Sequence, residues 1–144
     1  MVKILLMDDD EAFASVLSEL LAANGHSVRC CSTASDAIEL ISKTRFDLLI
    51  TDIIVRHDNK TVPDGGISLI SRLRGALSWN LEPWMKEMPI IAISGAIHNQ
   101  GLSDLLRITK DLGADMALGK PTDTGELLDA IHLLTRKPKN SPQG

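Results

Sequence analysis

The chain has 144 residues, a formal net charge of −4 and 44% hydrophobic residues. This length and apolar content suit one ordinary domain with its own core. The mildly acidic balance lacks the basic stripe of proteins that bind phosphate backbones, so we expect no nucleic acid as a ligand of this domain.

The two cysteines, Cys30 and Cys31, are neighbours in the sequence. A disulfide between neighbours is strained and two thiols cannot build a structural zinc cage, so we expect both to be reduced, as in cytoplasmic proteins. No apolar run approaches the roughly 20 residues of a membrane span, and the N-terminus lacks a signal-peptide pattern. The sequence therefore predicts a cytoplasmic protein that does not enter the membrane.

Short apolar runs alternate with helical patterns from the first residues onward. The first half predicts strands over 4–7, 27–31 and 48–51, separated by helices with apolar residues at Phe13, Val16, Leu17, Leu20 and Leu21 and at Ala34, Ala37, Ile38 and Ile41. The acid Asp10 stands where the first of these helices begins and is expected to cap it.

The second half repeats this rhythm. It predicts strands over 89–94 and 116–118 and helices with apolar residues at Ile67, Ile70, Leu73 and Leu77, at Leu102, Leu105, Leu106 and Leu112, and at Leu127, Leu128, Ile131 and Leu134. Five strand–helix units in strict alternation predict an α/β fold, namely a doubly wound five-stranded parallel sheet with helices on both faces.

Polar residues follow the predicted strands at the points where they end. Asp8 and Asp9 follow the first strand, Asp52 the third and Lys120 the fifth, while Ser94 closes the fourth. Ligands of such sheets bind at the carboxyl ends of the strands, so we expect these groups to converge on one edge.

The chemistry of that edge follows from its residue types. Three carboxylates held close together repel one another, and oxygen ligands alone favour a hard cation such as Mg²⁺. A lysine and a hydroxyl have no place in a simple metal cage, but Lys120 and Ser94 would suit the oxygens of an arriving phosphoryl group. Asp52, central in the sheet, would then be the nucleophile that forms an acyl phosphate.

Five motifs carry a family resemblance: ILLMDDDEAF (4–13), FDLLITD (46–52), PDGG (63–66), IIAISGA (90–96) and GADMALGKP (113–121). With these motifs in this order, the chain resembles the CheY-like receiver domain of response regulators in two-component signalling, over roughly residues 2 to 135. The resemblance implies that Asp8 and Asp9 hold Mg²⁺, that Asp52 is the phosphoacceptor, that the backbone carbonyl of Ile54 completes the metal site, and that Ser94 and Lys120 contact the phosphoryl group.

The resemblance also implies a role. A receiver is a phosphoacceptor switch and not an enzyme, since it catalyses only its own phosphorylation and dephosphorylation. Its phosphodonor would be a sensor histidine kinase or a phosphotransfer protein, and its output a downstream partner or a homodimer. Residues 1–136 are expected to form the receiver domain and residues 137–144 a C-terminal tail or linker.

Three features depart from the family pattern. The stretch 53–63 is longer than usual and is expected to form an inserted loop beside the site. The segment 78–88 holds both tryptophans, Trp79 and Trp84, and is either an extra helix packed on the body or a docking surface. Ala117 occupies a position where receivers often place an aromatic residue that moves on activation, so Ser94 would have to signal by another route.

Three other readings remain open from the sequence. The first is a receiver-like interaction module that no longer uses phosphate. The second is a flavodoxin-like binder of a cofactor or nucleotide, which lacks support because acids stand where a glycine-rich loop is expected. The third is a Mg²⁺-dependent phosphatase with its nucleophile in Asp8-x-Asp10, against which the central Asp52 and the Lys120-Pro121 pair favour a receiver.

Overall fold

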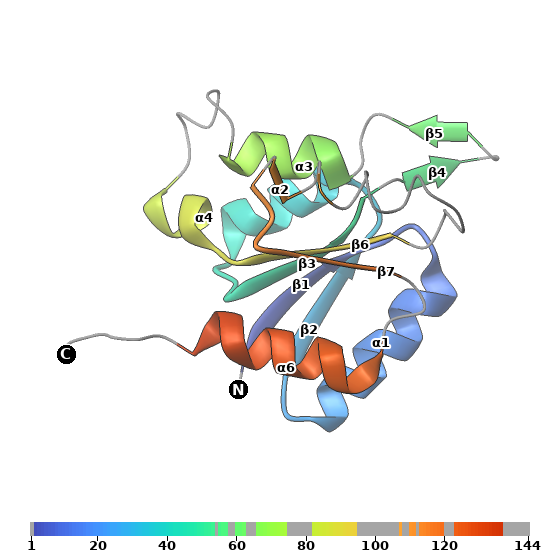
Figure 1. The fold of residues 1–144 in the computed structure, drawn as a ribbon. Helices are drawn as coiled ribbons and strands as arrows, with labels where there is room; N and C mark the ends of the chain where they lie inside the picture. The colour runs from blue at the N-terminus through green and yellow to red at the C-terminus, as the bar shows by residue number, and fades with distance from the viewer. Residues whose placement is uncertain are drawn as a thin grey trace.

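The computed structural model describes residues 2–53, 55–57, 60–62, 66–74, 82–94, 107, 110–111, 113–119 and 123–136. Five strands form a central parallel sheet: β1 (Lys3–Met7), β2 (Ser27–Cys31), β3 (Leu48–Asp52), β6 (Ile90–Ser94) and β7 (Met116–Gly119). Their order across the sheet is β2-β1-β3-β6-β7, so the chain reverses its direction of winding at β1 and β3 (Figure 1). The predicted five-stranded parallel sheet is confirmed.

Helices cover both faces of this sheet (Figure 1). One face carries α1 (Glu11–Ala23) and α6 (Thr124–Thr135), and the other carries α2 (Ala34–Lys43), α3 (Gly66–Arg74) and α4 (Pro83–Glu87). The doubly wound arrangement is therefore as expected. None of the helices within the described part of the chain has the length and apolar character to span a membrane.

The core is divided into two layers by the alternation of side chains along the strands. Leu5 and Leu49 point into the cluster formed with α2, α3 and α4, while Leu6 and Ile50 point into the cluster formed with α1 and α6. All five residues of β3 are buried. A strand covered on both faces reads as one apolar run, which is why its sequence shows no alternation of polar and apolar residues.

The first helix begins as expected, at a cap made by Asp10. A side-chain oxygen of Asp10 accepts a hydrogen bond from the backbone N–H of Phe13 at 3.0 Å. One residue of the predicted apolar face of this helix is misplaced, because Val16 is 69% exposed whereas Leu17 is buried. Consecutive helical residues point about 100° apart, and at this pair Leu17 lies toward the core while Val16 lies toward solvent.

The stretch after Asp52 differs from the expected loop. It contains an antiparallel hairpin of β4 (Val55–His57) and β5 (Lys60–Val62), with Val55 opposite Val62. In Figure 1 the hairpin projects from the edge at which β3 ends. The missed signal is the run VRH and KTV around a polar pair, since valine and threonine favour strands.

The segment before β6 does form an extra helix packed on the body. In α4, Met85 is buried, and Met88 just beyond it is buried as well. Trp84 packs against the same cluster, and the guanidinium of Arg45 lies 5.6 Å from the centre of its ring. Trp84 therefore belongs to a helix packed on the body. Trp79 lies outside the described residues, as do Leu77 and most of the predicted helix from Leu102 to Leu112.

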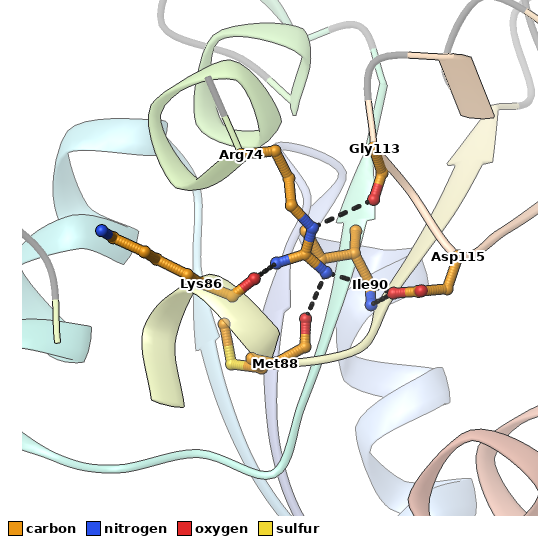
Figure 2. A network of polar contacts seen from close by, with 6 residues as sticks. All are labelled: Arg74, Lys86, Met88, Ile90, Gly113 and Asp115. Atoms are coloured by element: carbon orange, nitrogen blue, oxygen red, sulfur yellow. Dashed lines mark hydrogen bonds and ion pairs between the residues drawn. The ribbon is translucent and has the colours of Figure 1, made fainter. Parts of the chain in front are cut away.

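Arg74, the last residue of α3, connects this helix with α4 and with the residues that precede β6 and β7 (Figure 2). The guanidinium of Arg74 donates hydrogen bonds to the carbonyls of Lys86, Met88 and Gly113, the last two at 2.6 and 3.2 Å. It also pairs with the carboxylate of Asp115 at 3.2 Å. This network therefore adds to the packing of Met85, Met88 and Trp84, which holds the inserted helix on the body.

Candidate functional site

Three predicted acids meet at the carboxyl edge of the sheet. Asp8 and Asp9 follow β1, and Asp52 is the last residue of β3. The two strands are paired in parallel with Met7 opposite Thr51, which places Asp8 next to Asp52. Carboxylate oxygens of Asp8, Asp9 and Asp52 all lie within 4.8 Å of one another. The structure thus brings together residues that are more than 40 positions apart in the sequence.

Two of these carboxylates are withdrawn from water. Asp8 is 3% exposed and Asp52 is 7% exposed, while Asp9 is half-buried. Asp8 is also anchored by the backbone, because its Oδ1 accepts from the N–H of Asp10 at 2.9 Å and its own N–H donates to the carbonyl of Cys31 at 3.0 Å. Buried like charges at this separation raise the free energy of the ionised site unless a cation binds.

The donor set fits a hard divalent cation. All three ligand groups are carboxylates, and Mg²⁺ takes a small number of these together with waters and phosphate oxygens. Burial, helped by Asp36 and Cys30, raises the pKa of the Cys31 thiol to about 12, so this thiol is protonated at neutral pH. The residues present therefore match the magnesium site expected from the sequence.

The remaining predicted site residues are placed only in part. Ser94 ends β6 and stands opposite Gly119 of β7, so its backbone lies at the same edge as Asp52; its side chain lies outside the described residues. Ile54 and Lys120 both lie outside the described residues as well. Lys120 directly follows Gly119, the last residue of β7, which is the strand next to β6.

Sequence reasoning missed two residues beside Asp52. Thr51 is fully buried, and its hydroxyl donates to the carbonyl of Asp52 at 2.9 Å. Gly66, the first residue of α3, packs directly against the same carbonyl. The available signals were a threonine inside an apolar strand run and the second glycine of PDGG, neither of which predicts a contact with Asp52 by itself.

An open groove of about 390 Å³ leads away from Asp8, between α1 and the end of β2. Its lining is largely polar or small: Glu11, Ser15, Ser18, Glu19, Cys30 and Ser32 contribute along with Asp8 itself. Of the three clustered acids, Asp8 contributes to this lining.

Comparison with known proteins shows the family. The sequence matches the response regulator receiver domain over residues 4–132. The chain is 29% identical over 136 residues to the transcriptional regulatory protein DltR of Streptococcus agalactiae, a match that covers 94% of this chain and 53% of DltR. The chain thus spans about half the length of this curated relative.

Solved structures show the same fold. The receiver domain of the Francisella response regulator 1452 is similar with a TM-score of 0.76 and 22% identity, over 96% of this chain and 100% of that one. The receiver domain of the sensor histidine kinase PA1611 from Pseudomonas aeruginosa, whose structure has a magnesium ion coordinated in the active site cleft, is similar with a TM-score of 0.73 and 20% identity, over 94% of this chain and 98% of that one. Since the family match runs through all five strands of the sheet and all three clustered acids, the chain belongs to the response regulator receiver domains of two-component signalling.

Proposed function

We propose that Asp52 is the phosphoacceptor of this receiver and that Asp8, Asp9, Asp52 and the carbonyl of Ile54 hold the Mg²⁺ that phosphorylation needs. The observation that carries the proposal is the cluster of three carboxylates at the carboxyl edge of the sheet, two of them buried. A buried anionic cluster of this kind suits a divalent cation, and the magnesium in the cleft of the PA1611 receiver domain supports the same assignment.

The chemistry assigns one task to each group. A carboxylate oxygen of Asp52 attacks phosphorus, the bond from phosphorus to the leaving group of the donor breaks, and an acyl phosphate forms. Bound Mg²⁺ would neutralise the charge that the phosphoryl oxygens bring to the cluster. Lys120 would pair with a phosphoryl oxygen and Ser94 would donate its hydroxyl to another.

The donor and the output are proposed from family membership. A sensor histidine kinase or a phosphotransfer protein would supply the phosphoryl group in the cytoplasm, and a downstream partner or a second copy of the domain would read the result. We propose residues 1–136 as the receiver and 137–144 as a tail or linker. Apart from its own phosphorylation and dephosphorylation, the domain would catalyse nothing.

The test is the mass of the intact protein after incubation with acetyl phosphate and Mg²⁺. We expect one added phosphoryl group in the wild type and in Asp129→Ala, which removes an exposed acid of α6, and none in Asp52→Ala. Omission of Mg²⁺ should abolish the adduct. Beryllofluoride, a noncovalent mimic of the phosphoryl group, should shift NMR signals of residues near Asp52 in the wild type only when Mg²⁺ is present.

Two results would contradict the proposal. An adduct that persists in Asp52→Ala would move the phosphoacceptor to another residue. The absence of an adduct, of a beryllofluoride response and of Mg²⁺ binding in the folded wild type would favour an interaction module that no longer uses phosphate.

A further inference from the structure

The residue that precedes the proposed phosphoacceptor carries a buried hydroxyl. Thr51 precedes Asp52 on β3, has no exposed surface, and sits on the apolar side of the sheet covered by α2 and α3. Its Oγ1 donates to the carbonyl oxygen of Asp52 at 2.9 Å, and the sulfur of Met7 lies 4.0 Å from the same Oγ1. The strongest polar partner of this hydroxyl in the described structure is therefore the backbone of Asp52.

A glycine lies against the same carbonyl oxygen. A Cβ atom at Gly66 would overlap the carbonyl oxygen of Asp52, and it would lie 2.8 Å from the carbonyl carbon of Asp52 and 2.9 Å from the Cα of Ile53. All three are backbone atoms at the end of a central strand, so they cannot move aside as the tip of a flexible side chain could. The first turn of α3 can approach Asp52 this closely only because residue 66 has no side chain.

We propose that Thr51 and Gly66 together fix the backbone of Asp52 and act as positioning residues for phosphoryl transfer. The inference rests on the proposed role of Asp52. The hydroxyl donates to the carbonyl oxygen of Asp52, and the glycine packs against it, so together they fix the peptide plane between Asp52 and Ile53. The direction of the Asp52 side chain and the path toward the proposed carbonyl ligand of Ile54 both depend on that plane.

The choice of threonine at position 51 favours a role in orienting Asp52 over a role in stability alone. Valine has nearly the shape of threonine, favours strands, and would bury no hydroxyl in the apolar layer around Leu49 and Ala92. Valine at position 51 would fill nearly the same space but would place no donor on the carbonyl of Asp52. The hydroxyl is explained if the orientation of Asp52 matters, since an acceptor displaced by 1 Å can lose about a hundredfold in rate.

The test compares two site variants with two matched controls. Thr51→Val removes the hydroxyl and Thr51→Ser keeps it; Thr135→Val removes a hydroxyl that donates to the carbonyl of Ile131 in α6, far from the site. Gly66→Ala adds a Cβ against Asp52, whereas Gly125→Ala adds one whose nearest neighbour, a carboxylate oxygen of Asp123, is at an ordinary 3.4 Å. For each protein, the rate of adduct formation with acetyl phosphate, the Kd for Mg²⁺ and the urea midpoint are measured.

We expect Thr51→Val to slow phosphorylation about tenfold and to weaken Mg²⁺ binding while its urea midpoint stays near that of the wild type. Thr51→Ser should restore the rate, and the two controls should phosphorylate at the wild-type rate. Gly66→Ala should lose more than Thr51→Val; if it fails to fold, the comparison of Thr51→Val with Thr51→Ser decides alone. A wild-type rate of phosphorylation and wild-type Mg²⁺ affinity in folded Thr51→Val would show that Thr51 does not position Asp52. Asp52 would still stand as the acceptor. No adduct in the wild type would remove the proposed function and this inference with it.

Discussion

Asp8 combines a charge with a structural contact. Its carboxylate lies within 4.8 Å of those of Asp9 and Asp52, yet one of its oxygens also accepts the N–H of Asp10, the residue that caps α1. The charge opposes folding in the absence of a cation, whereas the hydrogen bond supports the turn from β1 into α1. The two contributions can be separated, because asparagine keeps an oxygen acceptor and loses the charge.

We predict opposite effects of Asp8→Asn on stability and on metal binding. Without Mg²⁺ the free energy of unfolding should rise by roughly 1 kcal/mol, because one repulsive charge is removed from a buried cluster. The affinity for Mg²⁺ should fall at least about tenfold, since a charged ligand is lost. Urea unfolding with and without Mg²⁺ measures both effects.

The matched control for this prediction is Asp129→Asn, which changes an exposed acid of α6 and should alter neither quantity. A destabilised Asp8→Asn protein with unchanged Mg²⁺ affinity would show that the carboxylate serves the turn and not a metal.

At the scale of elements, the network around Arg74 replaces contacts that the short helix α4 cannot make for itself. A helix of five residues leaves most of its carbonyls without partners inside the helix. Arg74 donates to the carbonyl of Lys86 in α4 and to that of Met88, the residue just after the helix. The side chain of Arg74 also lies against Gly113, where a Cβ would meet its Cγ at 2.6 Å and where the backbone φ is +127°. Both the space and the backbone conformation thus favour glycine at position 113.

We predict that Arg74→Met lowers the free energy of unfolding by about 2–3 kcal/mol, because methionine fills part of the space but leaves half-buried carbonyls without donors. Arg72→Met, on an exposed position of the same helix, should stay within about 0.5 kcal/mol of the wild type. Chemical denaturation checks both variants.

The site should be unaffected by Arg74→Met in the molecules that remain folded. In Figure 1 α4 lies at the opposite end of the sheet from the hairpin β4–β5, and Asp52, the proposed phosphoacceptor, ends β3 just before this hairpin. A loss of phosphorylation rate larger than the loss of folded protein would show that this network also controls the site.

At the scale of the whole molecule, helices on both faces of the sheet bury neighbouring strand residues to the same degree, so both contribute to stability. Leu5 and Leu6 are consecutive in β1 and point to opposite faces, but both are buried, in the two different clusters. In a sheet with one face in water, one residue of such a pair would be exposed.

We therefore predict that Leu5→Ala and Leu6→Ala each cost about 2–5 kcal/mol of unfolding free energy, since each leaves a cavity in a closed layer. Leu133→Ala is the matched control, because Leu133 is 55% exposed and its truncation should cost less than about 0.5 kcal/mol. Unfolding in urea distinguishes the outcomes. A small effect for either Leu5→Ala or Leu6→Ala would mean that the layer on that face is loosely packed.

Local patterns in the sequence were sufficient for the five strands of the central sheet and for the edge at which the site lies, but not for the hairpin β4–β5. Apolar runs with helical patterns between them determine the five parallel strands, because a strand buried on both faces must be continuous in apolar residues. The acids Asp8, Asp9 and Asp52 follow such runs directly, and parallel strands bring their carboxyl ends to one edge. Their convergence could therefore be predicted without coordinates.

Only the tertiary structure decided how those acids are held. The hydrogen bond from Thr51 to Asp52 and the close approach of Gly66 depend on where α3 packs, and no local pattern specifies that distance. The same is true of Arg74, whose partners lie 12 to 41 residues away in the sequence. Spacing along the chain determines which residues reach the edge of the sheet, but contacts between layers determine their orientation, because packing energies depend on atoms that are distant in sequence.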